Sequence, residues 1–385
     1  MSSQPRIAIV GAGIHPFGRH EGVSALAMGA HAVRAALADA GLAWRDVQFA
    51  YGGSEDGGNA DTLVSELGPT GLPFVNVKNG CATGGSSLVS AVTALRSGAY
   101  EVGVVVGFDK HPRGAFQNDP ADWSLPPWYG EDGLMVTTQF FGAKLQRYMH
   151  EHDIPAKTLA EVAEKAFHNG SLTPHAWRRT PLSVDEILGA RMLAHPLTQY
   201  MLCSPGEGAV ALVVCRSEYL ERLPTARPVW LRSVAFRTRK GGSFEVFSPS
   251  LPLELTPSPT VDAAREAFEA ADVAPVEVDV VQVQDTESGA ELIHLAECGL
   301  CEHGEQVELY ATGATRIDGR LPVNTDGGCL ANGEPVGASG LRQVFEIVAQ
   351  LRGEAGERQV RGEPRVGFTH VYGAPGVSAC TVLSL

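Results

Sequence analysis

The sequence predicts an α/β fold built from two similar halves, and two observations carry that prediction. Short apolar runs alternate along the chain with amphipathic stretches of helical spacing, which is the pattern of strands connected by helices. The strings AVRAALADAGLAWRDVQFA and AAREAFEAADVAPVEVDVVQV can be laid side by side, because each is a helix, a short link and a strand. A duplicated α/β unit implies two similar sheets packed around a shared layer of helices. Loops at the carboxyl ends of both sheets then converge on one pocket.

The composition is that of an ordinary globular α/β enzyme of 385 residues. A chain of this length buries a large core, and we expect it to divide into residues 1–250 and 251–385. The net charge of −14 argues against non-specific binding to nucleic acid or to anionic membranes. Seven cysteines, an odd number, favour reduced thiols over a disulfide framework. The N-terminal string MSSQPRIAIVGAG enters a strand without a basic and apolar leader, so a cytoplasmic location is expected.

The first half begins with a strand, a helix and a second strand. The β-prone run that ends at Gly11-Ala12-Gly13 lacks the third glycine of a dinucleotide-binding loop, and Pro16 follows where the helix would start. A Rossmann cofactor site is therefore rejected. A helix is predicted over Ser24 to Ala40, where Gly41 ends it, and a strand over Val47 to Ala50.

The rest of the chain is organised around the string VKNGCATGGSSL. A strand over Pro73 to Val77 leads into the turn-like Asn79-Gly80, then Cys81, then a helix that includes Leu88 to Leu95. A thiol near a helix N-terminus is favoured as thiolate by the macrodipole and the unpaired N–H groups. The small residues after it let a backbone or an acyl chain come close. Cys81 is thus a candidate nucleophile, with a buried structural cysteine as the alternative.

A covering segment, residues 110–200, interrupts the α/β pattern. It is rich in Pro, Trp, His and charged residues, and insertions of this kind commonly cover a site. The other elements are predicted, in order, as a buried strand over Glu101 to Phe108, helices around Phe141 to His150 and Leu159 to His168, strands over Ala209 to Cys215 and Val229 to Phe236, a helix around Ala263 to Phe268, a strand over Val280 to Val283, helices over Gly289 to Glu297 and Gly340 to Leu351, and a strand pair within Val366 to Leu383.

Three parts of the sequence carry a family resemblance. They are IAIVGAGIHPFGR and NGCATGGSSL in the first half, HPLTQYMLCSPGEGAVALVV in the middle, and VNTDGGCLANGEPVGASGLRQV in the second half. Together they resemble the thiolase superfamily, most closely the sterol-carrier-protein-type thiolases, also described as non-specific lipid-transfer proteins. The resemblance implies a thiolase-like five-layered α-β-α-β-α fold, a homodimer, and chemistry on a coenzyme A thioester as substrate, with no further cofactor.

The catalytic motifs of the family are only partly present. The resemblance places Cys81 at the nucleophile position, which implies an acyl-cysteine intermediate and a Claisen or retro-Claisen step. The family's Gly-His-Pro is replaced by Gly333-Glu334-Pro335, and its His-Asp-Cys-Phe motif by Gln284-Asp285-Thr286-Glu287. Where other members place a C-terminal acid/base cysteine, this chain has His370.

The replacements have a chemical interpretation. His370 titrates near neutral pH and is expected to take the place of the missing acid/base cysteine. Gln284 can donate a hydrogen bond to an oxyanion or hold a water. An ionised Glu334 would repel an oxyanion, so a raised pKa through burial is needed for it to act as general acid or base. The alternative is that Glu334 orients its neighbours or meets a cation of a partner.

Four further residues are candidates for substrate binding. Tyr372 lies beside His370, and Gly376 lies in the turn that follows them. Asn324 precedes a double glycine, where its amide can support the loop, and His111 follows a strand end at the start of the covering segment. Each has packing as its alternative, and for His111 a surface-loop position.

One Cys-x-x-Cys pattern raises the question of a metal site. Cys298 and Cys301, with His303 close by, lack a second ligand pair at a fitting spacing. No metal site is expected.

The predicted function is that of a thiolase-like acyl-CoA C-acyltransferase of lipid metabolism. Cys81 takes the acyl group, His370 is the main acid/base, and Glu334 with Gln284 tunes or orients the second step. A first alternative is retro-aldol cleavage of a 3-hydroxyacyl-CoA, since variant aldolases of the superfamily replace the same positions and work with a zinc-ribbon/OB-fold partner subunit. A partner subunit of this kind is a possible partner of this chain too. A second alternative is a non-catalytic acyl-CoA or lipid-binding protein.

Overall fold

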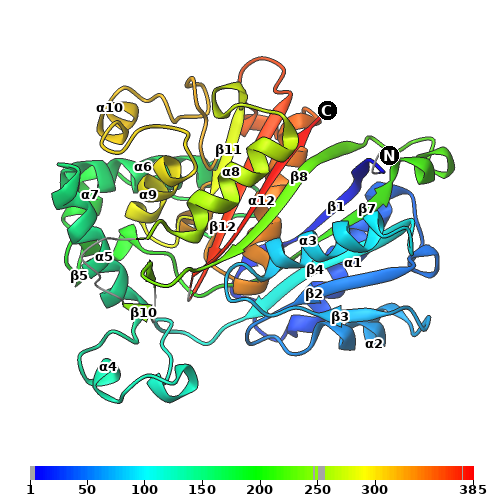
Figure 1. Ribbon diagram of the computed structural model, residues 1–385, viewed down its shortest axis with the longest axis horizontal. Helices are drawn as coiled ribbons and strands as arrows, with labels where there is room; N and C mark the ends of the chain where they lie inside the picture. The colour runs from blue at the N-terminus through cyan, green and yellow to red at the C-terminus, as the bar shows by residue number, and fades with distance from the viewer. Residues whose placement is uncertain (1–4, 246–247, 250–255, 375) are drawn as a thin grey trace.

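A twisted mixed sheet runs through the whole computed structural model, which describes residues 5–245, 248–249, 256–374 and 376–385 (Figure 1). Within these residues the sheet has nine strands in the order β11-β12-β13-β8-β1-β7-β4-β2-β3. They are β1 (Ile7–Gly18), β2 (Phe49–Gly53), β3 (Phe74–Asn76), β4 (Val102–Lys110), β7 (Glu207–Arg216), β8 (Val229–Thr238), β11 (Val280–Val283), β12 (Val366–Gly373) and β13 (Val377–Ser384). The short strands β5 (Met192–Ala194) and β6 (Leu197–Thr198) pair with each other, as do β9 (Phe244–Glu245) and β10 (Ser248–Pro249).

The sheet consists of two halves that repeat one strand order, joined where β1 pairs with β8. The first half, β3-β2-β4-β7-β1, uses five strands in the chain order 3-2-4-5-1. The second half, β11-β12-β13-β8, has the same order, with its third strand reduced to a parallel bridge between Val281 and Val323. The predicted duplication is confirmed. The division at residue 250 stays a prediction, and β8, which precedes it, pairs along β13.

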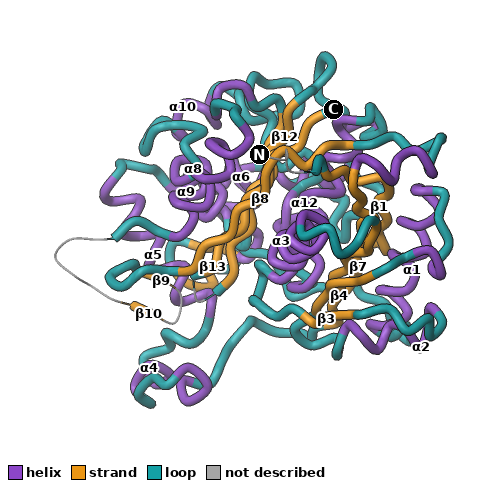
Figure 2. The backbone as a smooth tube through the Cα atoms, turned by 45° about the vertical axis from the view of Figure 1, so that its right-hand side comes forward, coloured by secondary structure: helices purple, strands orange, loops and turns teal. Residues whose placement is uncertain are grey.

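Helices complete a five-layered arrangement. In Figure 2, α3 (Thr83–Arg96) and α12 (Val336–Leu351) lie between the two halves of the sheet, and they pack on each other and on strands of both halves. The outer face of the first half is covered by α1 (Ala25–Ala40), and that of the second half by α8 (Pro259–Ala271) and α9 (Ser288–Glu297). The predicted α-β-α-β-α architecture is therefore confirmed.

Local sequence explains the ends and contacts of these helices. Ser24 caps α1 by accepting a hydrogen bond from the backbone N–H of Ala27 at 3.0 Å, and Gly41, with φ of 69°, ends it in the left-handed region. In the inner layer, a Cβ on Gly84 of α3 would lie 2.9 Å from the backbone nitrogen of Leu341 in α12. The two inner helices thus approach closely only because glycine stands at their contact.

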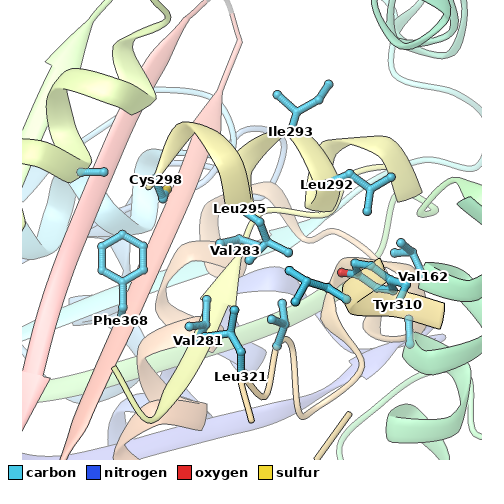
Figure 3. Packing of buried hydrophobic residues seen from close by; sticks show 14 of the residues in the cluster. Val162, Val281, Val283, Leu292, Ile293, Leu295, Cys298, Tyr310, Leu321 and Phe368 are labelled. Atoms are coloured by element: carbon cyan, nitrogen blue, oxygen red, sulfur yellow. The ribbon is translucent and has the colours of Figure 1, made fainter. Parts of the chain in front are cut away.

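The covering segment forms its own layer beside the second half. Its helices are α4 (Trp128–Glu131), α5 (Thr137–Glu151), α6 (Ala156–Ser171) and α7 (Val184–Leu188), and the remaining short helices are α2 (Val64–Leu67), α10 (Gln306–Ala311) and α11 (Gly328–Asn332). Figure 3 shows Val162 of α6 and Tyr310 of α10 beside Leu292 of α9, in one buried cluster that continues to Phe368 of β12. This packing fixes α5 and α6 against the core. In the described parts of the chain, every helix is too short or too polar to cross a membrane.

Candidate active site

Cys81 lies on a tight elbow between β3 and α3. Gly80 has φ of 54°, a conformation that glycine adopts readily, and the backbone N–H of Thr83 donates to the Gly80 carbonyl at 2.9 Å. The Thr83 hydroxyl accepts from the backbone N–H of Asn79 at 2.9 Å. These bonds hold the thiol one residue ahead of the N-cap of α3, at the carboxyl end of the first half of the sheet. The strand, elbow and helix match the sequence prediction.

The thiol opens into a cavity of about 640 Å³. The covering segment contributes Phe116, Trp123 and Phe141 to its wall, whereas the second half of the chain contributes Thr286 and Tyr372. Loops from both halves therefore meet at one cavity, and the covering segment closes over it, as the sequence predicts. The aromatic side chains give this wall a largely apolar surface.

The carboxylate of Glu334 lies at the centre of the site. It is fully buried, and it lies close enough to the Cys81 thiol for its charge to raise the pKa of that thiol. Its Oε2 accepts from Cys203 Sγ at 3.6 Å, and its Oε1 accepts from Gln284 Nε2 at 2.6 Å and from the Ser339 hydroxyl at 3.2 Å. Hydrogen bonds from all sides compensate a buried carboxylate for its lost hydration.

Backbone contacts fix the position of this carboxylate. Glu334 lies between α11 and α12, and its N–H donates to the Ser204 carbonyl at 2.9 Å. Its own carbonyl accepts from the N–H of Gly206 at 3.1 Å. The two segments form a short parallel bridge between Pro205 and Glu334. The loop before β7 and the loop before α12 are therefore joined at Glu334.

The protonation of Cys81 differs from the sequence expectation. Burial raises the pKa of the Cys81 thiol well above its ordinary value, and the negative charge of Glu334 raises that pKa further. These effects outweigh the macrodipole of α3, which was expected to favour thiolate. The resting form of Cys81 is the thiol. Nucleophilic attack by its sulfur therefore requires a base, and Glu334 is the nearby carboxylate that acts on this thiol.

His370 does not lie beside the thiol, so the placement expected for it is wrong. Successive side chains of β12 point to opposite faces of the sheet. A Cβ on Gly85 of α3 would lie 2.7 Å from Val371 Cγ1, so Val371 faces the inner helices. His370 faces the outer helices instead, with Nε2 3.1 Å from the hydroxyl of Thr260 and its ring 4.5 Å from that of His294. Burial, followed by the charge of His294, lowers the pKa of His370 well below its ordinary value.

Gln284 supports Glu334 instead of facing the cavity. Its amide nitrogen donates to Glu334 and to the Thr286 hydroxyl at 3.3 Å, and its backbone carbonyl is 2.7 Å from Nδ1 of His294. Both amide hydrogens therefore have acceptors within the protein. Of the two roles considered, orientation of Glu334 fits this geometry better than donation to an oxyanion, and the role itself stays a prediction.

The four candidate substrate-binding residues occupy different positions. Tyr372 lines the cavity, and its hydroxyl donates to the carboxylate of Glu245 at 2.5 Å. Gly376, with φ of 108°, lies against Glu245, one residue from Val377 in the cavity wall. Asn324 lies behind β11, where its side-chain oxygen accepts from the N–H of Val283 at 3.0 Å. Its loop-supporting alternative fits this position.

His111 is buried and not on the surface. Its Nδ1 lies 2.6 Å from Asp56, and its Nε2 accepts from the backbone N–H of Val336 at 3.1 Å. Asp56 and Val336 both line the cavity, so His111 stands behind the wall and ties its two sides together. A substrate-binding role for His111 stays a prediction.

Two residues near the thiol were not singled out from the sequence. Thr286 lines the cavity, and Cys203 donates its thiol to Glu334. A signal for Cys203 was present, since it lies within the quoted string HPLTQYMLCSPGEGAVALVV. Cys203 contacts Glu334 across 131 positions of the chain, and local sequence pattern does not reveal such a contact. Among the described residues, no group of three or more His, Cys, Asp and Glu side chains is arranged to hold a metal ion.

The sequence is similar to two family models and to several known proteins. The sequence matches the family described as thiolase, N-terminal domain, over residues 7–178, and the one described as thiolase C-terminal domain-like over residues 250–384. The benzoylsuccinyl-CoA thiolase subunit BbsB of Thauera aromatica is 30% identical and covers 97% of this chain and 96% of its own. The acetyl-CoA acetyltransferase of Methanothermobacter thermautotrophicus is 31% identical and covers 97% of both chains. Sterol carrier protein 2 of Homo sapiens is 28% identical over 100% of this chain and 74% of its own.

Solved structures show the same fold. The complex named Ltp2-ChsH2(DUF35) aldolase contains a chain with a TM-score of 0.87 and 24% identity, covering 99% of this chain and 98% of its own. Human mitochondrial 3-ketoacyl-CoA thiolase has a TM-score of 0.74 and 14% identity, with 99% of both chains covered.

Proposed function

Since this chain belongs to the thiolase family, we propose that it is an acyl-CoA C-acyltransferase that forms an acyl thioester on Cys81 and then makes or breaks a carbon–carbon bond. The observation that carries the proposal is that the Cys81 thiol lines the cavity and lies close to the buried carboxylate of Glu334, whose charge acts on it. A nucleophile and a base close together are the minimum that acyl transfer requires.

Glu334 acts here as the base that a histidine provides in the family motif. Its carboxylate takes the thiol proton while the Cys81 sulfur attacks the thioester carbonyl carbon. The carbon–sulfur bond to coenzyme A then breaks, and the departing coenzyme A thiolate receives the proton from Glu334. Acyl-Cys81 and free coenzyme A result, with Glu334 restored to its ionised form.

The cavity indicates the kind of acyl group. Phe116, Trp123 and Phe141 of the covering segment, with Tyr372 opposite, suit an apolar or aromatic acyl chain. The proposed substrate is therefore an acyl-CoA whose acyl group is larger than acetyl. The proposed assembly is a homodimer.

A retro-aldolase is the second candidate, and the raised pKa of Cys81 favours it because a resting thiol is a weak nucleophile. In that reaction Glu334 would take the proton of a 3-hydroxyl group, and Cys81 would not form a covalent bond. The structural neighbour named as an aldolase carries a DUF35 component in its name, which is compatible with a partner subunit. The zinc-ribbon/OB-fold partner implied by the family resemblance belongs to this candidate. Under it, Cys81→Ser would keep most activity and Glu334→Gln would abolish it.

Intact-mass measurement after incubation with acyl-CoA tests the first proposal. A medium-chain acyl-CoA and benzoyl-CoA are each expected to add one acyl group to the wild-type protein, and acetyl-CoA, the small-acyl comparison, is expected to add it more slowly. Cys81→Ala should give no adduct, whereas Cys380→Ala, which removes a buried thiol of β13, should give the wild-type adduct. The proposal fails if no thioester labels the wild type, or if the adduct persists in Cys81→Ala.

A further inference from the structure

A second thiol, that of Cys203, shares the carboxylate of Glu334 with Cys81. Its Sγ lies 3.6 Å from Glu334 Oε2, to which it donates. Cys203 also lines a second cavity of about 270 Å³. That cavity and the one at Cys81 have Phe116, Thr137 and Thr286 in common, so the two cavities are adjacent. A group bound at Cys81 therefore has a neighbouring subsite with its own thiol.

Backbone and side-chain contacts with neighbouring segments fix the position of Cys203. Its backbone N–H donates to the carbonyl of Thr286 at 2.9 Å, and the next residue, Ser204, accepts from the N–H of Glu334 at 2.9 Å. The hydroxyl of Ser204 accepts from the guanidinium of Arg178 at 2.6 Å. These contacts hold Cys203 and the segment of Glu334 in fixed relative positions, which is what proton transfer between their side chains requires.

The environment of Cys203 keeps its proton on sulfur at rest. Burial raises the pKa of the Cys203 thiol well above its ordinary value, and the charges of Glu334 and Asp285 raise it further. A thiolate formed there transiently is a correspondingly strong base. This is the property needed to remove a proton from the carbon next to a thioester.

We propose that Cys203 is the acid/base of the carbon–carbon step, exchanging a proton with the α-carbon of the second acyl-CoA. The assignment rests on the proposed acyltransferase function and extends it to a catalytic residue. Cys203 takes the acid/base role that was expected for His370, whose side chain lies on the other face of β12.

The proton and electron balance closes within three groups. Starting from acyl-Cys81, Glu334 takes the proton of Cys203, and the Cys203 thiolate takes a proton from the α-carbon of the acceptor acyl-CoA. The carbanion attacks the carbonyl carbon of acyl-Cys81, the new carbon–carbon bond forms, and the bond to the Cys81 sulfur breaks. The Cys81 thiolate then receives the proton held by Glu334. Each group ends in its resting form, and the reverse sequence cleaves a 3-ketoacyl-CoA.

The experiment separates the acylation step from the α-carbon step. Acyl-adduct formation is followed by intact mass, and α-proton removal is followed as deuterium incorporation into acetyl-CoA and the larger acyl-CoA in D₂O. Wild type is expected to show both. Cys203→Ala should form the adduct at a rate within a few-fold of wild type and lose deuterium exchange by about 10²- to 10⁴-fold, the usual contribution of a general acid/base. Cys203→Ser, which keeps the shape of the side chain, should behave in the same way.

Cys329→Ala is the matched control. Cys329 is also buried and also feels the charge of Glu334, but its sulfur packs against Arg342 at 3.9 Å, and it is outside the described linings of both cavities. It should keep both activities. Deuterium exchange within threefold of wild type in either Cys203 variant would overturn the assignment, as would loss of the adduct in both, or an adduct without exchange in wild type. Absence of the adduct in wild type would instead overturn the proposed function.

Discussion

At the scale of single residues, the exchange of a histidine for Glu334 determines the chemistry of the site. A histidine at this position would be neutral or positive and would attract a thiolate. Here burial, and after it the charge of this carboxylate, raises the pKa of the Cys81 thiol and keeps it protonated until attack occurs. A thiol, an amide and a hydroxyl, those of Cys203, Gln284 and Ser339, donate to this one carboxylate, which explains how its charge is accommodated without exposure to water.

Replacement of Glu334 by Gln should separate the reactivity of the thiol from catalysis. Without the negative charge that raises the pKa of Cys81, the pH profile of its alkylation by iodoacetamide should shift to lower pH. Without the base, acyl transfer from acyl-CoA should slow by about 10²- to 10⁴-fold. Both are measured by mass spectrometry, as rates of label and of acyl adduct on Cys81.

The control for this prediction is Glu357→Gln, which removes an exposed carboxylate outside the cavity. It should leave both rates unchanged. An alkylation profile of Glu334→Gln that coincides with wild type would show that the charge of Glu334 does not govern the thiol.

At the scale of elements, the sequence predicted what depends on neighbouring residues. The end of α1 at Gly41 and the bounds of β11 were correct, because each follows from local pattern, and the predicted start of α1 at Ser24 was one residue early. The prediction for β12 was wrong about which face of the strand carries His370. Sequence places His370 near the motif position, but alternation along the strand gives Val371 to the inner helices, and a shift of one residue inverts every side chain.

The inner pair of helices gives a test of packing. Gly84→Ala should lower the free energy of unfolding by about 1–2 kcal/mol. Overpacking of a tight core contact costs about 1–3 kcal/mol, here in the upper part of that range, and the gain in helix propensity offsets about 1 kcal/mol of it. The added methyl would meet backbone, the nitrogen of Leu341 at 2.9 Å, which cannot rotate away. Urea unfolding followed by circular dichroism measures the change.

Gly241→Ala serves as the comparison for Gly84→Ala. A Cβ at Gly241 would have no heavy atom within 4 Å, apart from its two chain neighbours. Its stability should equal that of wild type. If Gly84→Ala were also as stable as wild type, the close approach of α3 and α12 would be incorrect.

At the scale of the whole molecule, the site exists only because distant parts of the chain meet. Cys81 comes from the first half, Glu334 and Gln284 from the second, and Cys203 from the loop between the covering segment and β7. The sequence could assign Cys81, which retains a residue of a recognisable motif, and could identify Glu334, which replaces one. It could not pair Cys203 with Glu334, because that contact depends on the bridge at Pro205, which forms only in the folded chain.

The stability of the protein in acid is also a property of the whole molecule. The contribution of one residue, His294, to that stability can be measured. Burial lowers the pKa of His294 to about 3, below the value of about 6.5 expected in the unfolded chain. A depressed native pKa gives stability that is complete above pH 6.5 and is lost as pH falls toward 3. At pH 5 the loss from this one group is about 2 kcal/mol, since each pKa unit corresponds to about 1.4 kcal/mol.

His294→Asn should remove that loss. The asparagine amide can still donate to the carbonyl of Gln284, as Nδ1 of His294 does in the assigned tautomer. The free energies of unfolding at pH 7 and pH 5, measured by urea titration, should therefore differ less in the variant than in wild type, by about 2 kcal/mol. Glu287 acts in the opposite direction, because burial raises its pKa to about 8 and its contribution to stability is lost as pH rises through that value. That contribution is common to both proteins and cancels in the comparison, whereas Glu287→Gln should steepen the loss in acid. Parallel pH profiles for wild type and His294→Asn would show that His294 is already protonated in the native protein, and that the outer face of the second half is open to water.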